Sequence, residues 1–164
     1  MIKNEAKLME EKVEYVRSAI EHRATWFYLL LEEMKKRGID REELGRAAVY
    51  NCGCFHGDQK KAACADCGDL REFSKVFADD TYHNVFQMEI LEETEDKFSV
   101  DFHYCPLVAA WIKAGAKEED MPLLCDIAME GDRGVVSRFD GYTFKLDGTI
   151  AEGEPVCRIR IKKK

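Results

Sequence analysis

The feature that most constrains the fold is a change of hydrophobic period in the middle of the chain. In "KFSVDFHYC", residues 97–105, apolar and polar side chains alternate strictly, which is the pattern of a β-strand with one buried face. The preceding segment "YHNVFQMEILEE" also alternates, with apolar residues at Phe86, Met88 and Ile90. The polar stretch "ETED" between them predicts a turn, so we expect an antiparallel hairpin.

The end of the chain predicts a second hairpin. Its strands are expected in "SRFDGYTFKL", residues 137–146, and "PVCRIRIKK", residues 155–163. In the last strand Cys157 shares a face with Ile159 and Ile161, while basic side chains take the other face. Such alternation predicts that the first face lies on the core and the second faces solvent.

The first segment of the chain has a helical period. Residues 4–37 predict one long helix, with Gly38 just after its last residue. Its apolar residues recur every seven positions or lie beside that row: Val13, Ile20, Phe27, Met34, Val16 and Leu30. This row could pack on the chain's own core or form the seam of a homodimer, and Arg23 interrupts it.

Shorter helices are expected from their caps and stops. Asp40 and Asp69 each have a glutamate three residues later, as in a capping box. The expected helices cover 41 to about 51–53, part of 69–80, 106–114 and 120–130, with Gly131 and Gly134 after the last one. Helices and hairpins alternate, so we predict an α+β fold in one domain, 1–164. Its helices cover one face of an antiparallel sheet of about four strands.

Charge and hydropathy argue against some classes of function. The net charge is −7 and the pI is about 5.2, whereas nucleic-acid-binding proteins usually present a basic face. No apolar run approaches the roughly 20 residues that span a membrane, and the first residues do not resemble a secretory signal. We therefore expect a cytosolic protein without a nucleic-acid or membrane partner. Its seven cysteines should then be reduced thiols, suited to catalysis or metal binding.

The densest group of cysteines lies in "NCGCFHGDQKKAACADCGD", residues 51–69. Cys52 and Cys54 flank a glycine, and Cys64 and Cys67 form a Cys-x-x-Cys pair. Zinc and iron–sulfur clusters need soft ligands that converge in this way. Three interpretations stay open: a bound metal or cluster, a redox disulfide, or thiols without a shared role.

The polar face of the strand at 97–105 carries Asp101, His103 and Cys105. Alternate residues of a strand lie about 7 Å apart on one face, so these three could ligate a metal or act together in acid–base chemistry. Cys105 also precedes Pro106 at a helix start, where the helix dipole and free amides lower the pKa of a thiol. The alternative is an ordinary polar face of an exposed sheet.

Further candidates lie near the end of the chain. Cys125 and Asp126 are expected in the middle of a helix, where methionines one turn away favour burial of the cysteine. Cys157 is likewise expected in the core. Glu130 and Asp132 could act as acid–base groups, although carboxylates at a helix end are usually solvated.

The order of these motifs resembles a known family. "HYCPLVAAWIKAG", "MPLLCDIAMEGDRG" and "YTFKLDGTIAEGEPVCRIRI" follow one another in the chain. They contain Cys105-Pro106, Cys125-Asp126, and Gly153-Glu154 followed by Cys157. In this order the chain resembles the L-2-amino-thiazoline-4-carboxylic acid hydrolase family over roughly residues 40–161, most clearly from residue 103 onward.

The resemblance implies a bacterial hydrolase that opens a small cyclic C–N bond in an L-2-amino-thiazoline-4-carboxylate-like substrate. Such a reaction needs an activated nucleophile and a proton donor for the leaving nitrogen. The implied core is residues 39–164, after an N-terminal helix at 1–38.

In that core the resemblance implies specific roles. Cys105 would be nucleophile or metal ligand, with His103 and Asp126 as acid–base or supporting groups. Cys125 and Cys157 would converge on Cys105, as thiols or around zinc, iron or manganese that activates water.

Two further interpretations accompany this one. The four cysteines Cys52, Cys54, Cys64 and Cys67 are not part of the family pattern and could form a second metal site. The three later cysteines also resemble, more loosely, the 4-vinyl reductase-like small-molecule-binding domains. That second resemblance implies a binding module without turnover.

Overall fold

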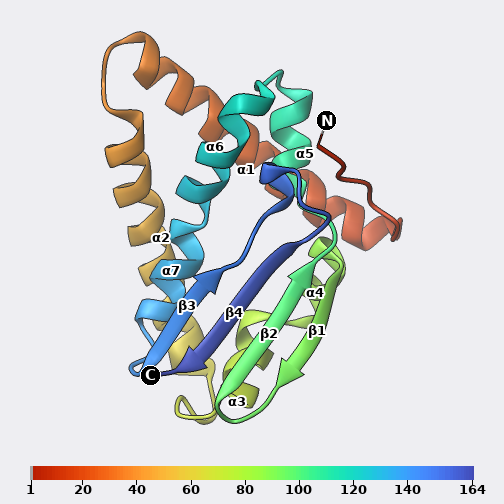
Figure 1. Cartoon of the computed structure of the whole chain (residues 1–164), viewed down its shortest axis with the longest axis vertical. Helices are drawn as coiled ribbons and strands as arrows, with labels where there is room; N and C mark the ends of the chain where they lie inside the picture. Colours follow the sequence, from red (N-terminus) through yellow and green to blue (C-terminus); the bar gives the residue numbers. More distant parts are fainter. Residues whose placement is uncertain (1) are drawn as a thin grey trace.

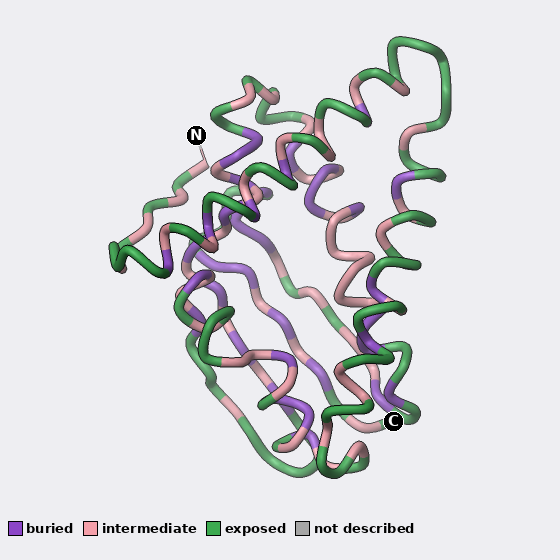
Figure 2. The backbone as a smooth tube through the Cα atoms, turned by 180° about the vertical axis from the view of Figure 1, so that it is seen from behind, coloured by how far each residue is buried: buried purple, intermediate pink, exposed green. Residues whose placement is uncertain are grey.

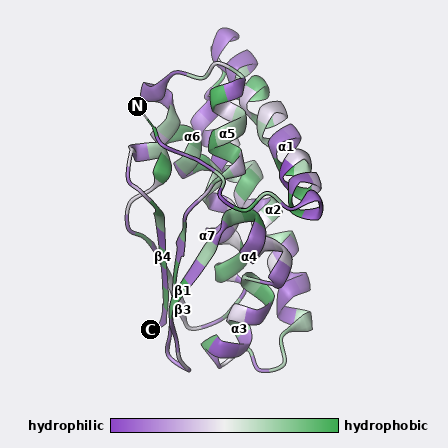
Figure 3. Cartoon of the chain, turned by 90° about the vertical axis from the view of Figure 1, so that its right-hand side faces the viewer, coloured by the Kyte–Doolittle hydropathy of each residue, from purple (hydrophilic) through white to green (hydrophobic). Residues whose placement is uncertain are grey.

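The computed structural model describes residues 2–164 as a four-stranded antiparallel sheet with helices on one face (Figures 1 and 3). The strands lie in the order β1-β2-β4-β3. Their bounds are β1 (Met88–Glu93), β2 (Lys97–Phe102), β3 (Tyr142–Leu146) and β4 (Cys157–Lys163). The helices are α1 (Glu11–Lys36), α2 (Arg41–Ala63), α3 (Leu70–Phe77), α4 (Asp80–Phe86), α5 (Pro106–Lys113), α6 (Met121–Ala128) and α7 (Glu130–Ser137), with short turns η1 (Glu118–Asp120) and η2 (Ile150–Glu152). The predicted α+β fold is confirmed.

The two faces of the sheet differ as the alternation predicts. The buried side chains of β2 pair with those of β4, as Phe98 with Ile161, Val100 with Ile159 and Phe102 with Cys157. On the outer face Asp101 forms a 2.7 Å ion pair with Arg160 of β4. Cys157 therefore belongs to the core side of the sheet, while Asp101 belongs to the other side.

Helix α1 begins at Glu11, not near residue 4 as predicted. Residues before it are bonded to other parts of the chain: the side-chain amide of Asn4 exchanges two 2.8 Å hydrogen bonds with the backbone of Cys105. The backbone N–H groups of Lys7 and Leu8 donate to Oε1 of Gln87. These partners satisfy the backbone groups that a helix would otherwise pair internally.

The inner side of α1 holds a buried arginine. Arg17 donates to the carbonyl oxygens of Val85, at 3.0 Å, and Leu8, at 2.6 Å. Its guanidinium also lies 4.6 Å from the ring centre of Tyr104. On the outer side, which is exposed in Figure 2, Trp26 and Leu30 are 69% and 50% exposed. The predicted heptad row packs on the chain's own core, where Val13 and Ile20 are buried and Phe27 and Met34 are partly buried. A homodimer through the N-terminal helix stays a prediction.

Helix α2 does not end near residues 51–53 as predicted but continues to Ala63. Gly53 and Gly57 are buried, one turn apart, against α7. A Cβ at Gly53 would overlap the carbonyl oxygen of Gly131 and lie 2.9 Å from its carbon, and a Cβ at Gly134 would lie 2.9 Å from the amide nitrogen of Cys54. The glycines therefore permit close contact of two helices instead of ending one.

Two other boundaries differ from the prediction for local reasons. Helix α4 occupies the first half of the segment predicted as a strand, because Asp79 accepts hydrogen bonds from the N–H groups of Thr81 and Tyr82. Gln87, at φ 50°, ends that helix, so β1 starts at Met88.

The helix predicted at 120–130 is in fact two helices, α6 and α7, that meet at Met129. Gly131 and Gly134 lie inside α7 instead of after a helix, and β3 starts at Tyr142 instead of residue 137. Among residues 2–164, none of the helices combines the length and apolar character needed to cross a membrane.

Candidate functional site

Cys105 lies at the N-cap of α5 and packs against the hydrophobic core. Strand β2 ends at Phe102, so Cys105 lies beyond the alternation that was predicted to place it beside Asp101 and His103. Pro106 takes the first position of α5, where its missing N–H is not needed. The thiol is half-buried.

The environment of Cys105 raises its pKa to about 11, mainly because burial disfavours the charged thiolate. The N–H groups of Val108 and Leu107, at the start of α5, act in the opposite direction by stabilising negative charge on sulfur. The helix start was predicted to lower this pKa. That prediction is wrong in direction, because desolvation outweighs the helix amides.

Cys125 and Cys157 lie close enough to Cys105 for their charges to act on one another. Burial and, after it, the nearby Cys105 raise the pKa of Cys157 to about 12. The pKa of Cys125 is raised well above its usual range by burial, then by Cys157 and Cys105. The three thiols therefore form one group, which joins the N-cap of α5, helix α6 and the start of β4.

Neighbouring polar groups contact this set of thiols. The backbone N–H of Ile150 donates to Sγ of Cys157 at 3.3 Å. The buried hydroxyl of Thr149 lowers the pKa of Cys125, opposing burial, and donates to Oε2 of Glu152 at 3.0 Å. The residues of η2 therefore cover the thiols with polar backbone and side-chain groups.

Asp132, on α7, is a carboxyl whose pKa is raised toward neutral pH. Burial raises its pKa to about 6, against opposing charges of Lys60, Arg133 and Arg23. Its own charge acts on Cys105. Among the described residues the side chain of Asp132 has no hydrogen-bond or ion-pair partner.

Asp132→Asn is expected to stabilise the protein above pH 6 and to have little effect near pH 4. The folded state holds the Asp132 proton up to about pH 6, whereas the usual pKa is 3.8. Stability from this group is therefore present below pH 4 and lost as the pH rises through 6. Melting temperatures at pH 4.5 and 7.5 should differ between variant and wild type by roughly 5 °C more at the higher pH.

Asp126→Asn is the matched control, because its pKa is shifted the other way. Burial raises the pKa of Asp126, but hydrogen bonds and charges of Arg133 and Arg46 leave it below its usual value. The Asp126→Asn variant should therefore become less stable than wild type as the pH rises, since the stability from ionised Asp126 is present only above its usual pKa. A pH-independent effect at Asp132 would contradict the assigned pKa.

Asp126 lies in a network of ion pairs between α2, α6 and α7. Its two carboxylate oxygens bind Arg46, at 2.7 Å, and Arg133, at 2.6 Å. Glu130 binds the same two arginines. These contacts keep Asp126 ionised, and a role for it in proton transfer stays a prediction.

His103 lies on the outer face of the sheet, where its Nε2 is 2.8 Å from Oε2 of Glu89. It lines an open pocket of 380 Å³ together with the N-terminal segment and the end of α4, including Leu8, His83 and Gln87. Neither this pocket nor the group of thiols includes both His103 and Cys105. Their joint role is a prediction without a contact to support it.

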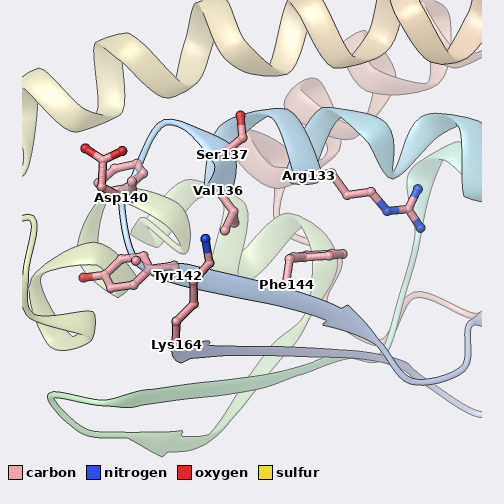
Figure 4. Close-up of a pocket in the computed structure, with 9 residues that line it drawn as sticks. Arg133, Val136, Ser137, Asp140, Tyr142, Phe144 and Lys164 are labelled. Carbon is pink, nitrogen blue, oxygen red and sulfur yellow. The ribbon is translucent and has the colours of Figure 1, made fainter.

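A second pocket, of 330 Å³, lies between α7 and β3 (Figure 4). Arg133, Val136, Tyr142, Phe144 and Lys164 are among the residues that line it. Cys105 is not among them, so the group of thiols and this pocket are separate features.

The four cysteines of residues 51–69 divide into two pairs. Cys52 is exposed on α2, and Cys54 contacts the Ser137 hydroxyl of α7 at 3.7 Å. Cys64 and Cys67 lie after α2, in the turn before α3. Across residues 2–164, no three His, Cys, Asp or Glu side chains are grouped so that they could hold one metal ion. Zinc, iron or manganese at either set of cysteines stays a prediction.

Comparison with models of protein families gives a match over most of the chain. The model of the L-2-amino-thiazoline-4-carboxylic acid hydrolase family matches residues 17–161. The chain belongs to this family. The match includes Cys105, Cys125, Asp132 and Cys157, and it starts within α1, earlier than the resemblance from the motifs alone.

Comparisons with curated proteins and with solved structures show a shared fold but indicate no activity for this chain. None of the curated proteins matches the chain. A solved structure that is similar is the trafficking protein particle complex subunit 3 from Naegleria fowleri covalently bound to palmitic acid. It is 14% identical, with a TM-score of 0.60, over 88% of this chain and 94% of that one. At this identity the likeness shows a shared fold.

Sequence reasoning gave Asp132 little weight and gave Thr149 none. Asp132 was treated as a solvated carboxylate at the end of a helix, because the start of α7 could not be seen in the sequence. The one available signal was the heptad row of α1, which Arg23 interrupts with a charge. In the structure the charge of Arg23 acts on Asp132.

Proposed function

We propose that the protein hydrolyses a small cyclic C–N bond, in a substrate like L-2-amino-thiazoline-4-carboxylate, with Cys105 as nucleophile. The observation that carries the proposal is the location of Asp132, an unpartnered carboxyl, within electrostatic range of the half-buried Cys105 thiol. A nucleophile beside a base is the arrangement that covalent hydrolysis requires. Membership of the family supports the same class of reaction.

The proposed mechanism uses the two different pKa values. At neutral pH Asp132 is ionised and Cys105 carries its proton. As Sγ attacks the amidine carbon, Asp132 accepts the thiol proton, directly or through one water. The protonated Asp132 then donates to the ring nitrogen as the C–N bond breaks, and water releases the product from Cys105. The N–H groups of Leu107 and Val108 stabilise the thiolate during attack.

Arg23 suits the carboxylate of such a substrate. It has no hydrogen-bond or ion-pair partner among residues 2–164, whereas each of the other arginines in that range has one. Its charge acts on Asp132, which places it near the proposed base. A guanidinium binds a carboxylate through two parallel hydrogen bonds, so Arg23 would orient the ring toward Cys105.

The test is turnover of L-2-amino-thiazoline-4-carboxylate, followed by mass spectrometry of a product heavier by one water. We expect Arg23→Gln to raise KM by roughly tenfold, with a smaller change in kcat, because a ground-state carboxylate contact is lost. Arg37→Gln, at the C-cap of the same helix and with its side chain paired only to Glu33 at 3.9 Å, should behave as wild type. Absence of any product from the wild-type protein would overturn the proposal.

A second candidate function is a binding module without turnover, as in the 4-vinyl reductase-like domains. The observation that favours it is the raised pKa of all three grouped thiols, since protonated buried thiols are usually unreactive. The similar trafficking subunit carries a covalent palmitic acid. Intact mass of protein purified from cells discriminates the two: a thioester-linked acyl group together with no turnover would support binding.

A further inference from the structure

The Cys-x-x-Cys pair takes no part in the proposed hydrolysis, yet its turn is held in place by several contacts. Cys64 caps the end of α2, and Asp69 caps the start of α3. The Asp66 carboxylate accepts from the N–H of Gly68 at 2.8 Å, and its carbonyl accepts from the N–H of Asp69 at 3.2 Å. The Tyr142 hydroxyl donates to the carbonyl of Cys67 at 2.8 Å. The turn is therefore fixed from both helices and from β3.

Within this turn the two thiols lie close enough to act on each other. After burial, the charge of Cys67 and a thiol–thiol hydrogen bond are the next causes that raise the pKa of Cys64. Sγ of Cys67 also lies 3.6 Å from the carbonyl oxygen of Lys61, and Sγ of Cys64 lies 3.5 Å from that of Asp66. Both thiols are half-buried, so a small reagent can reach them.

From these contacts we propose that Cys64 and Cys67 form a dithiol–disulfide exchange site that reacts with low-molecular-weight disulfides of the glutathione type. One cysteine thiolate attacks a sulfur of the small disulfide, forms a mixed disulfide and releases one small thiolate. The second cysteine thiolate then attacks the mixed disulfide, closes the Cys64–Cys67 bond and releases the second small thiolate. The protein loses two protons and two electrons, and the small disulfide becomes two thiols.

The fixed turn favours the second step over accumulation of the mixed disulfide. Two thiols already in contact react within one molecule at a high effective concentration. Cys52 and Cys54 provide the contrast, because residues two apart on a helix point in different directions. They lie on α2, where the Cys54 thiol contacts the Ser137 hydroxyl of α7.

Oxidation at this site would act locally. The closed loop is short, so little of its effect on stability would come from chain entropy. Tyr142, which binds Cys67, also lines the 330 Å³ pocket of Figure 4. A change in the redox state of the pair would therefore reach one wall of that pocket through the Cys67–Tyr142 hydrogen bond.

The experiment treats the reduced full-length protein with oxidised glutathione, blocks remaining thiols with iodoacetamide, and maps tryptic peptides by mass. Trypsin releases residues 62–71, with only Cys64 and Cys67, and residues 47–60, with only Cys52 and Cys54. We expect the 62–71 peptide to be two hydrogen atoms lighter and without adduct. The 47–60 peptide should instead carry glutathione or the blocking group.

Single variants complete the test. Cys64→Ser and Cys67→Ser should each leave a glutathione adduct on the remaining cysteine of 62–71, because the resolving thiol is gone. Adducts on both cysteines of the wild-type peptide, or blocking of both, would overturn the proposal. An internal disulfide in the 47–60 peptide at an equal rate would also overturn it, because contact between the thiols would then not matter.

Discussion

Replacing Gly53 by alanine is expected to lower the free energy of unfolding by about 3 kcal/mol, because the new methyl group has no space. Its Cβ would overlap the backbone carbonyl of Gly131 in the first turn of α7, and a backbone group cannot rotate away as a side chain can. Helices α2 and α7 would have to separate along their whole contact. Thermal unfolding should show a melting temperature lower by roughly 6–12 °C.

Gly131→Ala is the matched control, since it adds the same group to the other side of the same contact. There the nearest atom is Cγ1 of Val49 at 3.6 Å, which is ordinary van der Waals contact. Alanine also favours a helix interior by about 1 kcal/mol over glycine. This variant should be as stable as wild type or slightly more stable. Equal melting temperatures for the two variants would show that α2 and α7 are not so close in solution.

The glycine contact also explains what the sequence could and could not predict about the fold. Strands β2 and β4 were predicted correctly because alternation is local and each strand has one buried face. The end of α2 was placed too early because Gly53 signals a helix stop only when nothing packs against it. Its partner α7 lies about 80 residues later in the chain, and no local pattern connects the two.

The candidate site was predictable to a similar extent. The order of Cys105, Cys125 and Cys157 identified the family, which the family model confirms. The proposed base could not be chosen in this way, since Asp126 and Asp132 are both acidic residues near one helix junction. Only the packed structure shows that Asp126 is held by Arg46 of α2, while the side chain of Asp132 has no hydrogen bond or ion pair among residues 2–164.

Within the proposed hydrolysis, Cys105→Ala is expected to reduce kcat by on the order of 10³-fold or more, because the covalent step loses its nucleophile. Cys105→Ser should be nearly as inactive: a hydroxyl is far less acidic than a thiol, and Asp132, with a pKa of about 6, is too weak a base for it. Initial rates of product formation measure both effects. KM should change less than kcat, because Arg23 and not Cys105 is expected to hold the substrate.

Stability and a second cysteine provide the controls for this prediction. Cys105 is half-buried and its backbone, not its thiol, bonds to Asn4, so both variants should fold, with a cost of about 1 kcal/mol. Cys52→Ser removes an exposed thiol from α2 and should keep full activity. If Cys105→Ala hydrolysed the substrate at the wild-type rate, water and not sulfur would be the attacking group. Asp132 would then be the base for that water, and loss of activity in Asp132→Asn with retention in Cys105→Ala would establish it.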